Sequence, residues 1–284
     1  MPMLRSTIGA LVLVMTGTAA SAQTEPPLRI LITNDDGVSS AGIAALVTAL
    51  HPIADVVVAA PAEDNSGQSQ SITLFARPLK VDSLPASGGV PHYAVHGTPA
   101  DSVVFGLLET GKERPFDMVI SGINKGENVG DAVPVSGTIG AARQAVMMGV
   151  PAIAVSQQYR RDGGYDFRLA ARYTAQLVQQ LHRMGKAAPR LVNVNVPTEA
   201  KGVRFVPAAG SSFAITTLRK MGEEGGSASY RVDFKPGAAG TPGADTAALA
   251  AGYITVSALI PYANDTAATR SLEKVKAIRA LPAR

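Results

Sequence analysis

The sequence predicts a doubly wound α/β fold built on a mainly parallel, Rossmann-like sheet. Short runs rich in Val, Ile and Leu alternate with longer segments of helical periodicity through the first 200 residues. Such continuous apolar runs are typical of strands that helices cover on both faces. Hydrophobic residues make up 46% of the chain and charged residues 17%, which allows a sizeable core and argues against disorder.

The expected elements alternate regularly up to about residue 200. The expected strands cover residues 29–33, 54–61, 92–97, 116–122, 151–156 and 190–197. The expected helices cover residues 40–51, 98–111, 136–149 and 165–185. The second helix has the clearest boundaries, with Thr98 as its N-cap and Pro99 in the first helical position. Asp101 lies in its first turn, and Gly111 is expected to end it.

The alternation changes after about residue 200. We expect strands of a smaller, partly antiparallel extension over residues 202–209, 228–234 and 252–261. The segment 235–252 is rich in Gly, Ala and Pro, which predicts a mobile loop that leads into a short helix. A C-terminal helix is expected over residues 265–281.

The N-terminal segment has the pattern of a secretory signal peptide. Arg5 precedes a short apolar run, and Ala20 and Ala22 occupy the −3 and −1 positions of a cut after Ala22. No later segment is long and apolar enough to span a bilayer, so we expect a soluble mature protein that is exported to the periplasm. The expected parts are the signal peptide (1–22) and a single domain (23–284), which consists of a core (28–200) and a C-terminal extension (201–284).

The composition excludes several classes of function. The chain contains no cysteine, so disulfides and thiolate chemistry are excluded, and a metal site would need oxygen or imidazole ligands. The net charge is +4, but the Lys and Arg residues are scattered rather than interleaved with aromatic residues. We therefore expect no nucleic-acid partner, and a mildly basic protein suits small anionic substrates.

Three polar loops are expected at the carboxyl edge of the sheet, where ligands bind in open parallel sheets. Asn34, Asp35 and Asp36 follow the first strand, residues 62–71 follow the second, and residues 123–138 follow a later core strand. Their carboxylate, hydroxyl and amide oxygens suit a hard divalent cation such as Mg²⁺ or Mn²⁺. A cation would also relieve the repulsion between the two adjacent carboxylates. Taken in isolation, the same two residues would instead be expected to cap the next helix.

The triplet Ser136-Gly137-Thr138 lies at a predicted helix start. Free backbone N–H groups and two hydroxyls at such a position suit a phosphate group. Beside a metal cluster, this triplet indicates metal-assisted hydrolysis of a phosphoester, in which the ion polarises the phosphoryl oxygens and lowers the pKa of the attacking water.

Four segments together resemble the signature segments of the SurE family of 5′-nucleotidases, the survival protein phosphatases. They are ILITNDDG, PAEDNSGQSQSIT, HGTPADSV and DMVISGINKGENVGDAVPVSGTIGAARQA. The resemblance runs from about residue 28 to 156 in the family's order and approximate spacing, and more weakly to about residue 265. It implies a SurE-like fold and metal-dependent dephosphorylation of nucleoside 5′-monophosphates.

The resemblance also implies roles for individual residues. One divalent cation, Mg²⁺, Mn²⁺ or similar, would be held by Asp35, Asp36, Ser66 and Asn124. Asp35 and Asn128 would be catalytic, with Asn128 contacting the substrate or the transition state. Phosphate contacts would come from Asn128, Ser136, Gly137 and Thr138.

Two features depart from the family pattern. The late segment GYITVSALIPY lacks the Thr-Pro that family members usually carry there. Because the C-terminal third contributes to oligomer contacts in the family, a homodimer or homotetramer is expected. The best-known members have no signal peptide and act in the cytoplasm, which is the alternative location.

Other functions remain as alternatives. A broader phosphomonoesterase or polyphosphatase would use the same site, and an exported nucleotide-binding protein would bind without turnover. A phosphatase with an aspartyl-phosphate intermediate needs Asp-x-Asp after the first strand, and Asn34 occupies the leading position here. No G-x-S-x-G, G-x-G-x-x-G or Walker A sequence follows a strand, so a serine hydrolase, a dinucleotide cofactor and an NTP motor are not expected.

Several further polar residues are expected to have structural roles. Asp101 is expected to stabilise its helix dipole rather than to act in catalysis. His92 and His96 would lie on one face of a strand, but no third metal ligand is near them in the sequence. Lys125 and Arg143 flank the phosphate region and are expected to be exposed charges.

Overall fold

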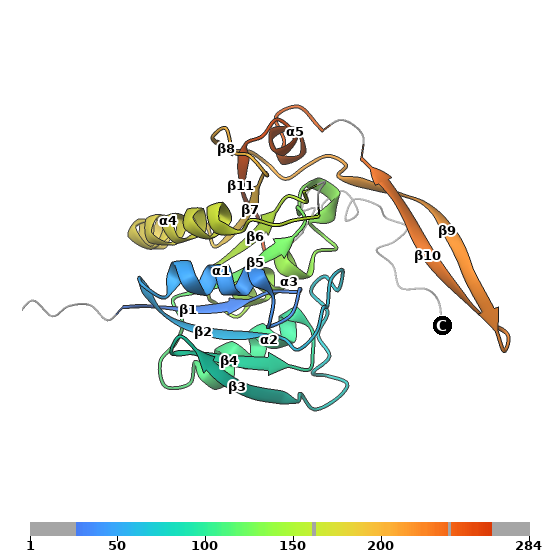
Figure 1. Ribbon diagram of the computed structural model, residues 1–284. Coiled ribbons are helices and arrows are strands. Elements are labelled where there is room, and N and C mark those ends of the chain that lie inside the picture. The colour runs from blue at the N-terminus through green and yellow to red at the C-terminus, as the bar shows by residue number, and fades with distance from the viewer. Residues whose placement is uncertain (1–26, 161–162, 238–239, 263–284) are drawn as a thin grey trace, which may run out of the picture.

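The central sheet has nine strands in the order β3-β4-β2-β1-β5-β6-β7-β11-β8 (Figure 1). The structure is a computed structural model that describes residues 27–160, 163–237 and 240–262. The strands of this sheet are β1 (Leu28–Thr33), β2 (Ala54–Pro61), β3 (Val81–Ser87), β4 (Val90–Val95), β5 (Met118–Lys125), β6 (Ala152–Gln157), β7 (Leu191–Val196), β8 (Val203–Phe205) and β11 (Ile254–Ala258). The six neighbours from β4 to β7 run parallel, which confirms the predicted fold class.

The chain reverses its direction of travel across the sheet between β1 and β5. It moves outward from β1 to β2 and β4, and then returns to place β5 on the other side of β1. In doubly wound sheets, ligands bind outside the carboxyl ends of the strands at such a switch point. The loops after β1 and β5 are therefore the place to look for a site.

Helices cover both faces of the parallel sheet (Figure 1). The covering helices are α1 (Ala41–Leu50), α2 (Pro99–Phe105), α3 (Gly137–Met147) and α4 (Arg168–Met184), whereas α5 (Asp245–Ala250) packs beside β11. Short π or 3₁₀ turns lie at Gly106–Thr110, Gly130–Ala132 and Gly185–Ala187. One buried cluster joins the sheet to α1 and α4, with Leu46 and Val178 among its members. A second cluster joins the opposite face to α2 and α3, with Val103 and Ile139 among its members.

The helix signals in the sequence correspond to observed caps. Ser40 caps α1 by accepting from the N–H of Ile43. Thr98 and Asp101 form a capping box at the start of α2, with Pro99 in the first turn. Helix α4 begins at Arg168, three residues later than expected.

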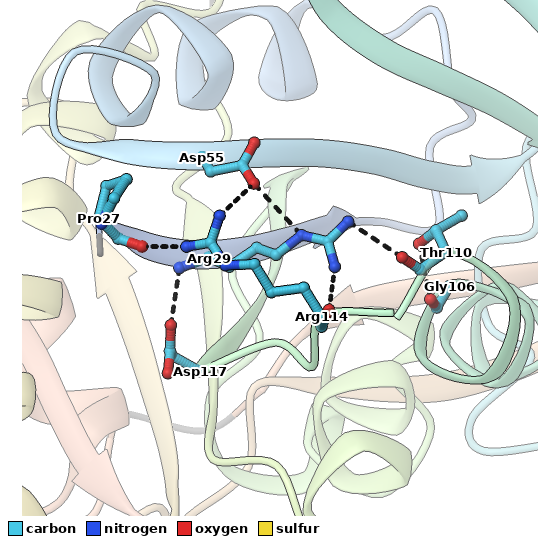
Figure 2. Close-up of polar contacts among 7 residues, drawn as sticks. All are labelled: Pro27, Arg29, Asp55, Gly106, Thr110, Arg114 and Asp117. Atoms are coloured by element: carbon cyan, nitrogen blue, oxygen red, sulfur yellow. Dashed lines mark hydrogen bonds and ion pairs between the residues drawn. The ribbon is translucent and has the colours of Figure 1, made fainter. Parts of the chain in front are cut away.

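A polar network joins three strands at the amino edge of the sheet (Figure 2). Arg29 and Arg114 both pair with Oδ2 of Asp55, at 3.3 Å from Nε and 3.0 Å from Nη1 respectively. The backbone N–H of Arg29 donates to Asp117 Oδ2 at 2.7 Å, and the N–H of Asp117 donates to the carbonyl of Arg29 at 2.9 Å. The network fixes β1, β2 and the start of β5 at the edge opposite the switch point, so the loops at their other ends start from fixed positions.

The structure corrects the expected C-terminal extension. Strands β8 and β11 belong to the main sheet, where β11 pairs antiparallel with β7. Only β9 (Phe213–Glu224) and β10 (Ser227–Pro236) form a separate antiparallel hairpin, which extends away from the body (Figure 1). Strands β3 and β9 were not expected from the sequence, because exposed strands lack the continuous apolar run of buried ones.

Two expectations lie outside the described residues. They are the signal peptide over residues 1–22 and the C-terminal helix over residues 265–281. In the described part of the chain, no helix combines the length and the apolar character that a membrane span requires.

Candidate functional site

Two loops and the end of β5 meet at the switch point between β1 and β5. Asp35 and Asp36 follow β1 directly, and Ser66 lies in the loop after β2. Asn124 lies within β5, because this strand continues to Lys125 instead of ending at residue 122 as expected. A register irregularity between Ser121 and Asn124 accompanies the extension.

The carboxylate of Asp35 is buried against the start of α3. The side chain is 3% exposed. Its Oδ1 accepts from Thr138 Oγ1 at 2.6 Å, and its Oδ2 accepts from the backbone N–H of Thr138 at 3.1 Å. This approach requires Gly137, because a Cβ there would lie 2.9 Å from the Cβ of Asp35. The N-terminus of a helix also stabilises a carboxylate through its dipole.

The carboxylate of Asp36 has a different hydrogen-bond partner from that of Asp35. Its Oδ2 accepts from the backbone N–H of Lys125 at 3.2 Å, which connects the end of β1 to the end of β5. Asn124 lies next to this contact and donates from Nδ2 to the carbonyl of Gly126 at 2.8 Å. Among the described residues, no partner is found for the Oδ1 of Asn124, which leaves that oxygen available as a ligand.

The loop with Ser66 is anchored on both sides. The N–H of Asn65 donates to the backbone carbonyl of Asp35 at 2.7 Å. Ser69 donates from Oγ to Pro134 O at 2.7 Å and from its N–H to Val135 O at 3.2 Å. Ser66 therefore stands between the end of β1 and the start of α3, and its side chain is exposed.

Some polar groups of the Ser136-Gly137-Thr138 triplet already have hydrogen-bond partners within the protein. Both polar groups of Thr138 that were expected to contact phosphate are bonded to Asp35. The Oγ of Ser136 caps α3 by accepting from Ile139 N at 3.1 Å, and its own proton remains a donor. Thr138 thus orients the carboxylate of Asp35, whereas the N–H of Gly137 and the hydroxyl of Ser136 are the donors left for an anion.

Asn128 is held by three residues that the sequence analysis did not single out. Its backbone N–H donates to Asn195 Oδ1 at 2.7 Å, and its carbonyl accepts from Asn193 Nδ2 at 2.9 Å. Its Nδ2 donates to Ser156 Oγ at 2.9 Å, which leaves one amide proton for a ligand. The available signal was the alternation of Asn and Val in the buried strand β7, because a buried Asn requires a polar partner.

The C-terminal extension also supports the loop after β5. The buried carboxylate of Asp245 accepts from the N–H of Gly130 at 3.3 Å and from the N–H of Ala209 at 3.0 Å. Asp131 accepts at Oδ1 from the N–H and the hydroxyl of Ser212, at 2.7 and 2.6 Å. The root of the β9–β10 hairpin is thereby joined to the loop that carries Asn128.

Burial dominates the electrostatics of the site. Burial, with a smaller contribution from the charge of Asp36, raises the pKa of Asp35 to about 6 against the lowering effect of the Thr138 hydrogen bonds. Burial also raises the pKa of Asp36, although the N–H and the charge of Lys125 lower it. A bound cation would favour the charged form of both carboxylates.

The donor groups fit a hard divalent cation. Within the described ranges, no group of three or more His, Asp or Glu side chains could hold a metal ion, so a cation would need neutral oxygens beside two carboxylates. Ser66 and Asn124 would supply such oxygens next to Asp35 and Asp36. Oxygen ligands of this kind are those that Mg²⁺ and Mn²⁺ prefer.

Other polar residues lie outside this group. Asp101 is buried and accepts from Thr98 and Thr73, in keeping with the structural role expected for it. His92 contacts the carbonyl of Val90 and His96 contacts Asp82, so their rings have separate partners. Lys125 is exposed as expected, whereas Arg143 is half-buried rather than exposed, and burial lowers its pKa.

Comparisons with known proteins identify the family of this chain. The family model described as "Survival protein SurE" matches residues 30–216. A protein of Methanothermobacter thermautotrophicus named 5′-nucleotidase SurE is 39% identical over 220 residues, which cover 74% of this chain and 83% of the relative. A protein of the same name from Syntrophotalea carbinolica is 37% identical over 239 residues, which cover 82% of this chain and 91% of the relative.

A solved structure shares the fold. The SurE protein from Aquifex aeolicus superimposes with a TM-score of 0.73 at 29% sequence identity. The match covers 89% of this chain and all of the other. The mainly parallel sheet is therefore the architecture of this family as well.

Replacement of Asp35 by Asn should stabilise the metal-free protein. With a folded-state pKa of about 6 against 3.8 for an unperturbed Asp, the folded state retains a proton between these values that the unfolded state has released. The contribution of Asp35 to the free energy of unfolding therefore falls as the pH rises from about 4 to 6, and it stays unfavourable above pH 6. We expect Asp35→Asn to raise the free energy of unfolding by about 1–3 kcal/mol above pH 6 and by much less at pH 4.

Denaturant unfolding in EDTA at both pH values measures this difference. The Asn side chain can still accept from the Thr138 N–H and donate to its hydroxyl, so the local contacts are kept. A variant that is less stable than wild type at pH 8 would contradict the electrostatic account of Asp35.

Proposed function

Because the chain belongs to the SurE family, we propose that it is a 5′-nucleotidase that hydrolyses nucleoside 5′-monophosphates to nucleoside and phosphate with the help of one divalent metal ion. Its relatives named 5′-nucleotidase match most of the chain, and membership of this family supports a nucleotide phosphatase. The proposed metal dependence rests on the residues around the switch point. The carboxylates after β1, Asn124 near the end of β5 and the loop with Ser66 lie around this point, near the N-terminus of α3.

The proposed metal ligands are Asp35, Asp36, Ser66 and Asn124. A bound divalent ion would polarise the phosphoryl oxygens and lower the pKa of an attacking water. The contact of Asp35 with Thr138 holds the carboxylate in one orientation, and the bond from Nδ2 to Gly126 holds the amide of Asn124. These contacts support a role for Asp35 and Asn124 as ligands whose side chains need no rearrangement when a cation binds.

The phosphate group is proposed to lie between Asn128 and the start of α3. The remaining amide proton of Asn128, the hydroxyl of Ser136 and the N–H of Gly137 are donors that face no competing acceptor in the described part of the chain. Donors that are already oriented stabilise charge as it develops on phosphoryl oxygens, which is where such sites gain most. The polar contacts of Asn128 with β7 keep its amide fixed for this role.

The hairpin supports the expected homo-oligomer. Leu218 and Val232 are opposite each other on one face of the β9–β10 hairpin, while Arg219 and Asp233 form an ion pair on the other face. An isolated two-stranded hairpin is marginal in water. The large exposed apolar residues of the hairpin are Ile215, Leu218, Met221, Tyr230 and Phe234. We propose that a second copy of this chain covers this apolar face, in a homodimer or homotetramer.

Residues 1–22 support export. A charged start, a short apolar run and an A-x-A cleavage pattern are the three parts of a secretory signal peptide. We propose cleavage after Ala22 and a periplasmic location.

Phosphate release from 5′-AMP tests the proposed function. We expect turnover by the protein to stop in EDTA and to return with Mn²⁺ or Mg²⁺. Asp35→Asn should lower the rate by on the order of 100-fold or more, because it removes a charged ligand at nearly constant volume. Glu109→Gln removes an exposed charge from the π turn after α2, where Glu109 pairs with Lys112, and this matched control should keep full activity.

Each alternative function gives a different result in this assay. Turnover that survives EDTA would indicate a covalent mechanism. Equal or faster release from non-nucleotide esters or polyphosphate would indicate a broader phosphatase. Metal binding without release from any ester would indicate a binding protein.

Mass measurement in solution tests the hairpin. We expect the wild type to be a dimer or tetramer at micromolar concentration and Leu218→Glu to shift it toward monomer, because the charge would be buried in the apolar contact. Arg231→Gln, on the polar face, should leave the mass unchanged. A monomeric wild type, or a mutant that assembles normally, would contradict the proposed contact.

Fractionation of a Gram-negative host that expresses the full chain tests export. The periplasmic protein should begin at Gln23 by mass, and replacement of Ala22 by a bulky residue should retain the precursor. Recovery of the uncleaved wild type from the cytoplasm would contradict the proposal.

A further inference from the structure

Three aromatic side chains form a continuous row beside the site. Tyr159 lies two residues after β6, and Tyr165 and Phe167 lie just before α4. The rings of Tyr165 and Phe167 stack at 5.4 Å with an interplanar angle of 9°. Tyr159 meets Tyr165 edge-on at 5.9 Å and 76°. The row runs from the core, where Phe167 is 6% exposed, to the surface, where Tyr159 is 58% exposed.

The row is attached to the loop that carries the site residues. The backbone N–H of Tyr159 donates to Glu127 Oε2 at 3.2 Å, and Glu127 precedes Asn128. The N–H of Gly126 donates to the carbonyl of Gln157 at 2.9 Å, two residues before Tyr159. The outer end of the row therefore stands at the same carboxyl edge of the sheet as the site residues.

The phenol of Tyr165 is partly buried in a negatively charged environment. Burial raises the pKa of its phenol, and the charges of Asp36 and Glu127 raise that pKa further, together with the neighbouring Tyr159. Glu127, which holds the backbone of Tyr159, immediately precedes Asn128. The exposed ring and the proposed phosphate position are therefore joined through the same short loop.

We propose that Tyr159 and Tyr165 form the nucleobase-binding surface of the substrate site. The base would stack on the exposed ring of Tyr159, while Tyr165, fixed by its stacking on the buried Phe167, holds that ring in place. This inference rests on the proposed function and adds the group that recognises the nucleoside part of the substrate. Stacking on an aromatic ring tolerates any base, so the surface selects for a nucleoside over a bare sugar phosphate rather than for one base.

Comparison of 5′-AMP with ribose 5-phosphate isolates the base, because the two esters share the sugar phosphate. We expect Tyr159→Ala to raise the KM for 5′-AMP by roughly 5- to 100-fold and to leave the KM for ribose 5-phosphate unchanged. Tyr159→Phe keeps the ring and should restore the wild-type KM. Phe205→Ala removes an exposed ring, 76% exposed against 58% for Tyr159, from the edge strand β8 and is the matched control.

Equilibrium dialysis with adenosine gives a readout that needs neither metal nor turnover. Adenosine should bind the wild type and Tyr159→Phe, and should bind Tyr159→Ala at least 5-fold more weakly. Because the chain has no Trp, the quenching of tyrosine emission at saturation follows the same binding. Tyr165→Ala should weaken adenosine binding as well, since it removes the support of Tyr159.

The outcomes distinguish failure of this inference from failure of the proposed function. If wild type hydrolyses 5′-AMP but Tyr159→Ala changes the KM of both esters equally, or of neither, the aromatic surface is overturned and the nucleotidase stands. If no ester is hydrolysed but adenosine binding still depends on Tyr159, the nucleotidase is overturned and the surface stands. Absence of both hydrolysis and adenosine binding in the wild type overturns both.

Discussion

The burial of the Asp35 carboxylate at the end of β1 is the constraint on which the rest of the site depends. An ionised carboxylate with so little exposure is costly unless hydrogen bonds or a cation compensate for the lost water. The start of α3 supplies the hydrogen bonds through Thr138, and Gly137 allows the close approach. The raised pKa that remains shows that this compensation is incomplete. A cation supplied from outside would complete it, which ties the stability of this end of the sheet to ligand binding.

The second requirement of the site is a rigid loop after β5. Long Gly-rich loops are mobile unless their backbone groups are hydrogen-bonded to the scaffold. Here the amides of Asn193 and Asn195 hold the backbone of Asn128, and Asp245 holds the N–H of Gly130. These partners come from β7 and α5, far along the chain. The C-terminal extension is therefore part of the site's support as well as the origin of the projecting hairpin.

The loop after β5 lies next to the positions proposed for both the phosphate and the base of the substrate. Asn128 is the residue proposed to contact the phosphate, and the neighbouring Glu127 holds the backbone of Tyr159. The loop between β5 and α3 is thus hydrogen-bonded to the aromatic row, and Asp36 accepts from Lys125 at the end of β5, next to the same loop. A shift of this loop would move both Asn128 and the residues that hold Tyr159, so nucleoside binding and phosphate chemistry would change together. The amino edge of the sheet, locked by Arg29 and Asp55, provides the fixed reference for this loop.

The sequence by itself determined the parallel core and the segments that make the site. Continuous apolar runs and local helix signals such as Thr98 and Ser136 depend on near neighbours, and they can be interpreted from the sequence alone. The roles expected for the metal and phosphate residues stay predictions. Tertiary structure alone decided the partners. It made Thr138 the hydrogen-bond partner of Asp35 and extended β5 to Lys125. It also placed β8 and β11 in the main sheet and paired β3 with β4. Such contacts join residues many positions apart, and a local pattern contains no information on which distant donor a buried acceptor will meet.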